Sequence, residues 1–278
     1  MIKIGCNYLS FKGLPLDIET FIKMSYEMRL DVADFHTRAF KLGDNAAILK
    51  QKALCVKYGL PIGYIGVAGN FSTKPEEQQA ALQRCREGID LAAFVGSPLI
   101  RVFGAQKIEG AASQDQVFDA LSNGLREASE YGAKKGVIVA LQNHNHGNIA
   151  STGESQVRIH KQVNHPNFSL LMDTGQWANA VGDEGHVDKI NPNTPIYDYM
   201  EQTIKYASYV RFKYYKIAGG KEELIDNDRV MGILKKAGFN GSISIVYEGK
   251  ENETTPERIE TIRKAAGELR TLLAKHGA

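Results

Sequence analysis

The segment VALQNHNHGN, residues 139–148, joins a short apolar run to a cluster of amide and imidazole side chains. On an extended strand, Gln142, His144 and His146 would face one side, because side chains alternate with a period of two. Histidines in such positions often do no more than satisfy a turn. Whether these two serve a binding site therefore depends on what the rest of the chain brings beside them.

An apolar run of this kind recurs along the whole chain. Eight short runs have the length and the β-branched or aromatic content of strands, and several are apolar almost throughout. Such runs are typical of parallel strands whose outer face is covered by helices. They are residues 2–6, 31–35, 61–67, 98–104, 137–142, 168–173, 209–214 and 242–248.

Helix-length segments with apolar residues at three- and four-residue spacing separate these runs. The clearest are residues 15–28, 74–96, 114–136 and 256–277. Proline is tolerated near the start of a helix, and glycine commonly ends one. The prolines that fit a helix start are Pro15, Pro75 and Pro256, and the glycines that fit a helix end are Gly96, Gly136 and Gly277.

Eight strand–helix alternations in 278 residues predict an α/β fold, a (β/α)8 TIM barrel, better than an open doubly wound sheet. No linker or shift in composition divides the chain, so residues 1–278 are expected to form a single domain. Residues 174–200 are rich in Gly, Asn and Asp and predict a long loop. Loops of that length in compact domains are usually functional.

The bulk composition excludes several functions. A net charge of +2 gives no electrostatic case for nucleic acid or for an anionic membrane. The three cysteines are isolated, which argues against a disulfide framework or a structural zinc site. The sequence starts without a signal-peptide pattern and contains no membrane-length apolar run, so a cytoplasmic protein is expected. Formation of a homo-oligomer remains open.

Polar side chains stand at the ends of the predicted strands, where the active site of a (β/α)8 barrel is built. A single such residue is often a helix cap, but charged groups that converge must be paired, metal-bound or engaged by a ligand. The strand-end residues are Asp34, His36, Arg101, Gln142, His144, Asp173, Tyr209, Arg211, Lys213 and Glu248. The sequence therefore predicts a shared site on one face of the barrel.

Five segments carry a resemblance to a known family. They are LIRVFG (99–104), VALQNHNH (139–146), LLMDTGQW (170–177), YVRFKYYK (209–216) and SIVYEG (244–249). With them the whole chain resembles the xylose-isomerase-like TIM barrels, a group of sugar-phosphate isomerase- and epimerase-like proteins. The resemblance implies one divalent metal held by Glu, Asp, His and Glu, and proton transfer next to a sugar carbonyl. Asp173 and Glu248 match two of these ligands.

The other ligand positions depart from the family pattern. Gln142 stands where the first glutamate is expected, and Arg211 stands where the histidine is expected. An arginine cannot lose its proton to bind a metal, but its planar fork suits carboxylates. Gln176 also replaces a histidine that often follows the aspartate. We therefore expect a site without a metal; if Mn or Mg binds at all, its ligands are Asp173, Glu248 and Gln142.

The resemblance and the residues together predict a carbohydrate-active enzyme for a small sugar or polyol, with no organic cofactor, because nucleotide and phosphate motifs are missing. The catalytic candidates are Glu248 as general base, His144 and Asp173. The substrate-binding candidates are Gln142, Arg211, Lys213, His36, Arg101 and Trp177. Trp177 could stack on a sugar ring or serve the core equally well.

Several reactions remain open at this stage. Aldose–ketose isomerisation needs one base and is favoured over two-base epimerisation, because Gln142 cannot act as a base. Elimination from an oxidised sugar, or cleavage of a C-glycoside, is an alternative. A non-catalytic sugar-binding barrel is a third reading, motivated by the replaced ligands. An apurinic endonuclease is set aside, since the chain has neither a cluster of zinc ligands nor a phosphate-binding groove.

Overall fold

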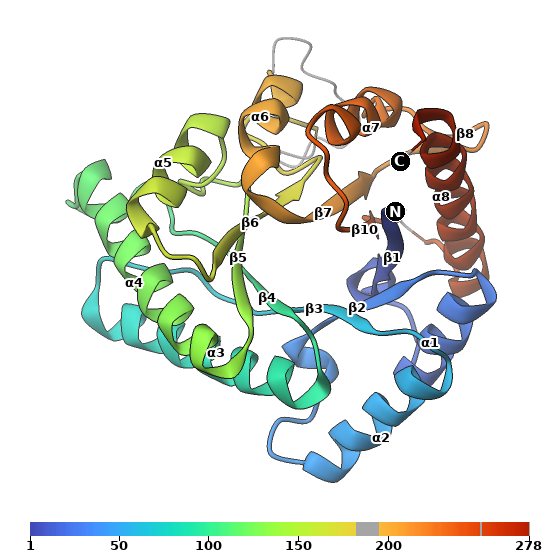
Figure 1. Ribbon diagram of the computed structural model, residues 1–278, viewed down its shortest axis with the longest axis horizontal. Helices are drawn as coiled ribbons and strands as arrows, with labels where there is room; N and C mark the ends of the chain where they lie inside the picture. Colours follow the sequence, from blue (N-terminus) through green and yellow to red (C-terminus); the bar gives the residue numbers. More distant parts are fainter. Residues whose placement is uncertain (182–194, 251, 278) are drawn as a thin grey trace.

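Eight parallel strands close into a barrel, which confirms the predicted (β/α)8 fold (Figure 1). The computed structural model describes residues 1–181, 195–250 and 252–277. The strands are β1 (Lys3–Asn7), β2 (Val32–His36), β3 (Ile62–Gly66), β4 (Leu99–Val102), β5 (Ile138–Gln142), β6 (Phe168–Asp173), β7 (Ala207–Tyr214) and β10 (Ser242–Tyr247). Each of the eight predicted runs contains one barrel strand or overlaps most of it.

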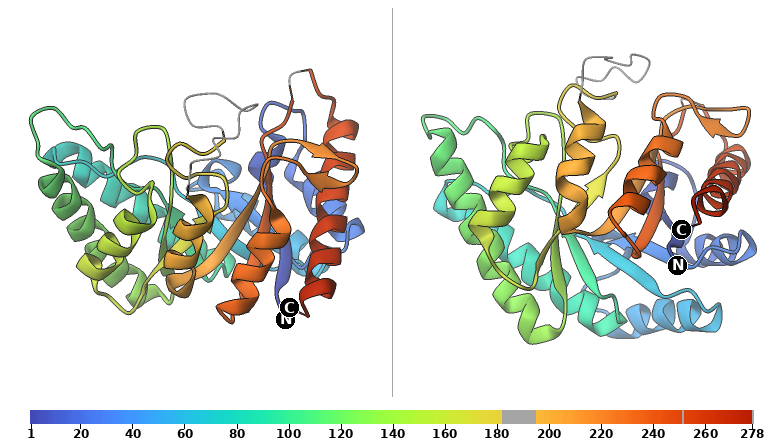
Figure 2. Two further views of the ribbon diagram at one scale, coloured as in Figure 1. Left: turned by 90° about the horizontal axis from the view of Figure 1, so that it is seen from above. Right: turned by 45° about the horizontal axis from the view of Figure 1, so that its top comes forward.

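Helices form a ring around the barrel (Figures 1 and 2). They are α1 (Ile18–Glu27), α2 (Asn45–Lys57), α3 (Pro75–Val95), α4 (Gln114–Lys135), α5 (Gly153–Val163), α6 (Ile196–Thr203), α7 (Asn227–Lys236) and α8 (Thr255–His276). Short 3-10 helices are η1 (Tyr8–Phe11), η2 (Thr37–Ala39) and η4 (Ile204–Tyr206). Figure 2 shows both chain ends at the end of the barrel opposite the long loops.

The predicted helix boundaries hold, with one exception. Pro75 and Pro256 lie in the first turn of α3 and α8, and the glycines that follow α3, α4 and α8 have left-handed backbone conformations. The prediction that Pro15 begins a helix is wrong. Helix α1 begins at Ile18 because the Asp17 side chain accepts a hydrogen bond from the Thr20 backbone N–H at 2.7 Å.

The loop predicted at residues 174–200 ends earlier than expected, because α6 begins at Ile196. Residues 182–194 of that prediction lie outside the described residues. A small antiparallel hairpin of β8 (Ile217–Ala218) and β9 (Lys221–Glu222) follows β7 and was not predicted. Its two-residue strands are too short to produce an alternating pattern.

The barrel interior has an apolar layer below and a polar layer above. Tyr64, Leu99, Ala140, Leu171 and Tyr209 form an apolar cluster, separate from the large core between strands and helices. Because side chains alternate along a strand, residues two positions further point inward as well, closer to the carboxyl ends. Those residues are Gly66, Arg101, Gln142, Asp173 and Arg211. The polar layer therefore sits at the barrel mouth.

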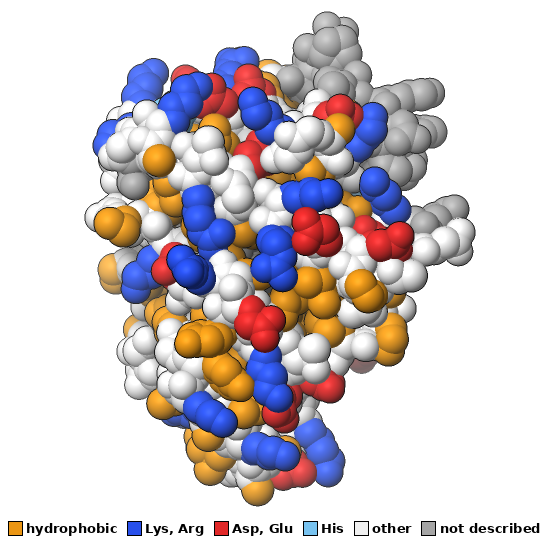
Figure 3. Space-filling view, turned by 90° about the vertical axis from the view of Figure 1, so that its right-hand side faces the viewer, with side chains coloured by type: hydrophobic (Ala, Val, Ile, Leu, Met, Phe, Trp, Pro, Cys, Tyr) orange, Lys and Arg blue, Asp and Glu red, His pale blue; other side chains and the backbone are white. Residues whose placement is uncertain are grey.

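On the face that carries α8, Lys and Arg side chains lie interspersed with Asp and Glu rather than gathered in one patch (Figure 3). In the described part of the chain, no helix is long and apolar enough to cross a membrane.

Candidate functional site

Gln142, Asp173 and Arg211 meet at the carboxyl ends of three neighbouring strands. Asp173 and Arg211 are register partners in the β6–β7 pair, and β5 lies on the other side of β6. An Arg211 Nη1–H donates to Gln142 Oε1, and Nη1 lies 3.4 Å from Asp173 Oδ2. Gln142 Nε2 donates to the same carboxylate oxygen at 3.2 Å. The three buried side chains thus form a closed polar triangle.

Asn143 fixes the Asp173 backbone, a role that the sequence analysis missed. Its Nδ2 donates to the Asp173 carbonyl at 2.9 Å, and its Oδ1 accepts from the Asp173 N–H at 2.7 Å. The Gly175 N–H donates to Asp173 Oδ1 at 3.1 Å. A Cβ at Gly175 would lie 2.6 Å from Cγ of Lys213, so only glycine fits at this position. Asn143 therefore holds β5 and β6 together at the site.

Lys213 and Glu248 form an ion pair at the mouth, one step above the triangle. The Lys213 side chain is 4% exposed, whereas the Glu248 side chain is 45% exposed. Attraction to the Lys213 ammonium lowers the pKa of Glu248 below its usual value, against the opposing effect of burial. Glu248 is therefore ionised at neutral pH and open to a ligand, so it can accept a proton, and the ion pair with Lys213 makes it a weaker base than an unpaired glutamate.

His144 and His36 are neutral near pH 7. Burial lowers the pKa of His144 to about 4 and that of His36 to about 3. His144 Nδ1 lies 2.9 Å from the Asn145 carbonyl oxygen, which can only accept, so Nδ1 carries the proton. Nε2 of the neutral ring is then free to accept a proton.

His146 does not continue the strand, which agrees with the predicted strand ending at residue 142. Strand β5 ends at Gln142, and His146 is an exposed residue with a φ of +55°. Its ring centroid lies 5.5 Å from that of His144. His146 therefore belongs to the loop beside the site.

Arg101 lies inside the barrel beside His36 and His144. Its Nη1–H donates to the Val67 carbonyl at 3.3 Å, and its guanidinium stacks on the Phe103 ring at 4.2 Å. A Cβ at Gly66 would lie 2.8 Å from Arg101 Nη2, so the glycine makes room for the guanidinium. Burial, with repulsion from Arg211, lowers the pKa of Arg101 to about 10.

Trp177 is buried in the core, 1% exposed, with its ring 5.6 Å from that of Tyr199 on α6. Its indole Nε1 has no hydrogen-bond partner among the described residues. Its predicted contact with substrate stays a prediction.

Below the triangle lies a second buried polar group, built around Asp34 and Tyr209, two of the strand-end residues that were expected at the shared site. Asp34 accepts hydrogen bonds from the Tyr209 hydroxyl at 2.8 and 2.9 Å, and Asn7 Nδ2 donates to the Tyr64 hydroxyl. A Cβ at Gly63 would lie 2.3 Å from the Asp34 carboxylate. Burial raises the pKa of Asp34 to about 7, against the opposing effect of the Tyr209 hydroxyl.

The raised pKa of Asp34 should make the free energy of unfolding depend on pH. A carboxyl whose folded-state pKa exceeds its unfolded value of 3.8 stabilises the fold at low pH and loses that contribution as pH rises toward 7. Between pH 4 and pH 7 the wild-type protein should lose roughly 4 kcal/mol relative to Asp34→Asn, an upper bound at 1.36 kcal/mol per pKa unit. Urea unfolding of both proteins across this range measures the difference; parallel curves would contradict the assignment.

The described side chains at the mouth do not fit a divalent metal. In residues 1–181, 195–250 and 252–277, no three His, Cys, Asp or Glu side chains gather closely enough to hold one. Arg211 occupies the space between Gln142 and Asp173, and a second cation there would suffer like-charge repulsion. Gln142 also offers a neutral oxygen where a carboxylate would be a stronger ligand.

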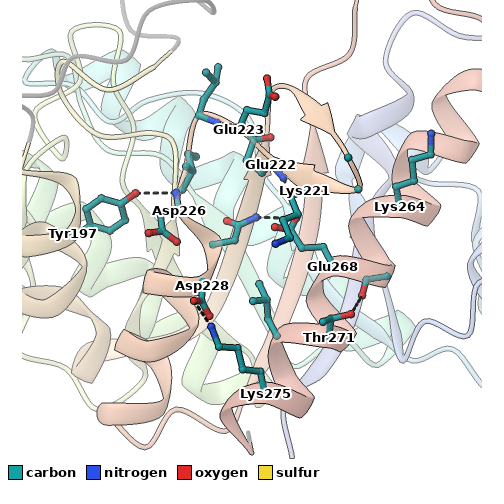
Figure 4. Close-up of a pocket in the computed structure, with 17 residues that line it drawn as sticks. Tyr197, Lys221, Glu222, Glu223, Asp226, Asp228, Lys264, Glu268, Thr271 and Lys275 are labelled. Atoms are coloured by element: carbon teal, nitrogen blue, oxygen red, sulfur yellow. Dashed lines mark hydrogen bonds and ion pairs between the residues drawn. The ribbon is translucent and has the colours of Figure 1, made fainter.

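A concave region of about 870 Å³ lies outside the barrel, between the β8–β9 hairpin and helices α7 and α8 (Figure 4). Its most buried acid, Glu222, accepts the backbone N–H groups of Tyr215, Lys216 and Leu224 at 2.8 to 3.1 Å. This carboxylate therefore stabilises the hairpin. The described lining of the region includes none of the strand-end residues, so the two places are separate.

Fold and mouth together define a (β/α)8 barrel with a polar site at the carboxyl ends of its strands. The chain belongs to the xylose isomerase-like TIM barrel family, whose sequence model matches residues 25–272. A comparison with curated protein sequences found no significant match.

Solved structures of low sequence identity share the fold. D-psicose 3-epimerase with D-tagatose, from Clostridium cellulolyticum H10, has a TM-score of 0.78 at 16% identity, covering 98% of this chain and 99% of that one. The 3-keto-D-glucoside 4-epimerase of E. coli has a TM-score of 0.74 at 17% identity, covering 98% and 100%. A probable 3-DHS dehydratase of Bacillus anthracis has a TM-score of 0.72 at 15% identity, covering 97% and 99%.

Proposed function

We propose that this protein is a carbohydrate-active enzyme that transfers a proton next to the carbonyl of a sugar or polyol derivative. The observation that carries the proposal is the half-exposed carboxylate of Glu248, paired with Lys213 directly above the Arg211 triangle. The names of the similar structures, two sugar epimerases and a dehydratase, support the same substrate class. An accessible carboxylate also suits the binding of sugar hydroxyls, so the exchange of a proton, and not the carboxylate alone, separates an enzyme from a purely sugar-binding barrel.

Each residue at the mouth has a part in the proposed step. Glu248 accepts the proton from the carbon beside the carbonyl, and the electron pair moves onto the carbonyl oxygen. Lys213 and Arg211 donate hydrogen bonds to that oxygen as it becomes negative, the role that a metal plays elsewhere. His144, neutral with Nε2 free, transfers the proton between the two oxygens. Asp173 and Gln142 hold Arg211 in place.

The proposed reaction uses one base. Return of the proton from Glu248 to the neighbouring carbon gives aldose–ketose isomerisation. Two-base epimerisation needs a second base on the opposite face, and Gln142 cannot supply it. If Glu248 instead gives the abstracted proton to the hydroxyl on the next carbon, that group leaves as water and a carbon–carbon double bond forms, which is elimination from an oxidised sugar. Both outcomes share the first step, so one experiment can test them together.

Exchange of the proton with solvent provides the test. We expect purified protein in D2O to incorporate deuterium at the carbon beside the carbonyl in at least one member of a panel of ketoses, aldoses and sugar acids. Proton NMR measures the exchange before any product is identified. A sugar that binds by calorimetry but neither exchanges nor reacts would favour the non-catalytic reading. Failure of every sugar to bind would defeat the proposal.

A further inference from the structure

One buried cation in the barrel, Arg101, forms no ion pair with any of the described residues. Arg101 is 1% exposed, and the bond to the Val67 carbonyl is the one hydrogen bond that its guanidinium makes within the described residues. Its Nε has no partner, and it forms no ion pair with any described carboxylate. Burying an unpaired charge is costly, and a buried arginine is normally held by carboxylates or by several acceptors.

The other two buried arginines of the described chain show the usual arrangement. Arg258, 5% exposed, lies 2.8 Å from Glu253 and also donates to the Ser10 carbonyl. Arg211 contacts both Asp173 and Gln142. Arg101 therefore differs in its partners and not in its burial.

The one described carboxylate whose charge acts on Arg101 is Asp173, and that carboxylate already contacts Arg211 and Gln142. His36 and Phe103 are beside it, and His36 is neutral near pH 7. Arg211, the nearest cation to act on it, repels it, and the buried Nε of Arg211 also lacks a partner. Two unsatisfied guanidinium donors thus remain in the mouth after every described ion pair is formed.

We propose that the substrate is a sugar acid whose carboxylate binds to Arg101. This inference rests on the proposed function, because it assigns a substrate class to the same site. A guanidinium presents a planar fork of donors that matches a carboxylate. One unpaired cation also balances the single charge of a carboxylate better than the double charge of a phosphate group. Arg211 Nε is the second donor available to the same ligand.

Binding measurements test the charge preference directly. Calorimetry would compare D-glucuronate with D-glucose and D-gluconate with D-glucitol, pairs that differ in the acid group. We expect the acid of at least one pair to bind more than about tenfold tighter, as charge-assisted bonds to a buried arginine require. Arg101→Met should abolish this preference and Arg101→Lys should restore part of it. D-glucose 6-phosphate tests whether the site prefers a phosphate group. Tighter binding of this probe than of the sugar acids would overturn the carboxylate assignment.

Thermal unfolding without ligand tests the unpaired charge by itself. Arg101→Met removes a charge that forms no ion pair within the described part of the chain, so the variant should melt at the same temperature as the wild type or higher. Arg258→Met is the matched control, since it removes a buried arginine that has a carboxylate partner. That variant should melt several degrees lower because Glu253 is left unpaired. An equal loss in both variants would overturn the inference.

The outcomes also separate this inference from the proposed function. If neutral sugars exchange deuterium and acids bind no more tightly, the proposed enzymatic function stands and the inference of a sugar-acid substrate is wrong. If acids bind through Arg101 but exchange no deuterium, the assignment of a sugar-acid ligand stands and the proposed proton transfer is wrong. If no probe binds, the comparison of Arg101→Met with Arg258→Met decides whether Arg101 is an unpaired cation.

Discussion

Replacement of Glu248 by glutamine should lower turnover by about a hundredfold or more while leaving ligand binding nearly unchanged. Glutamine keeps the size and the hydrogen-bonding oxygen of the side chain, but it cannot accept the proton. Lys213 keeps its acceptor at that oxygen, so the loss of charge should not displace it far. Steady-state rates with any sugar that passes the deuterium-exchange screen, together with calorimetric binding constants, measure the two effects separately.

A surface pair offers a matched control for this variant. Glu223 pairs with Lys216 at 2.7 Å and its side chain is 41% exposed, close to the 45% of Glu248. Glu223→Gln should leave turnover within about twofold of the wild type, because a surface ion pair contributes little. Equal losses in binding and turnover for Glu248→Gln would instead assign Glu248 a positioning role.

The fold could be predicted from sequence because its signal is local and repeated. Several barrel strands carry a nearly continuous apolar run, and β6 (Phe168–Asp173) was predicted to the residue. The β8–β9 hairpin carries no such signal. It is held by hydrogen bonds from the Tyr215 and Leu224 backbone N–H groups to the Glu222 carboxylate, which no alternating pattern of side chains reveals.

The candidate site also has a part that the sequence predicts and a part that it cannot reveal. Asp173, Arg211 and Gln142 were predicted to converge because parallel strands end on one face, and their contacts confirm it. The pairing of Asp34 with Tyr209 spans 175 residues, so no local pattern could reveal it. The sequence also cannot show that Arg101 lacks a partner among the described residues, because this depends on which side chains surround it in the folded barrel.

Exchange of two residues should convert the mouth into a metal site. In the wild type, Arg211 holds the space between Gln142 and Asp173, so we expect well below one equivalent of Mn, Mg or Zn in purified protein. Chelator should leave its melting temperature unchanged. The double variant Gln142→Glu with Arg211→His supplies the carboxylate and imidazole that divalent metals bind, beside Asp173 and Glu248.

The expected effect of metal on the double variant follows from mass action. A ligand present at a hundred times its dissociation constant, binding only the folded state, stabilises by about 2.7 kcal/mol. For a chain of this size that corresponds to a rise of roughly 5 to 10 °C in melting temperature with Mn²⁺. The single variant Gln142→Glu is the control, because its new carboxylate can pair with Arg211 and leaves no room for the ion. A stoichiometric metal in the unmodified protein, bound by Asp173 and Glu248, would contradict this reading, since Arg211 would then have to leave the carboxylate that it contacts.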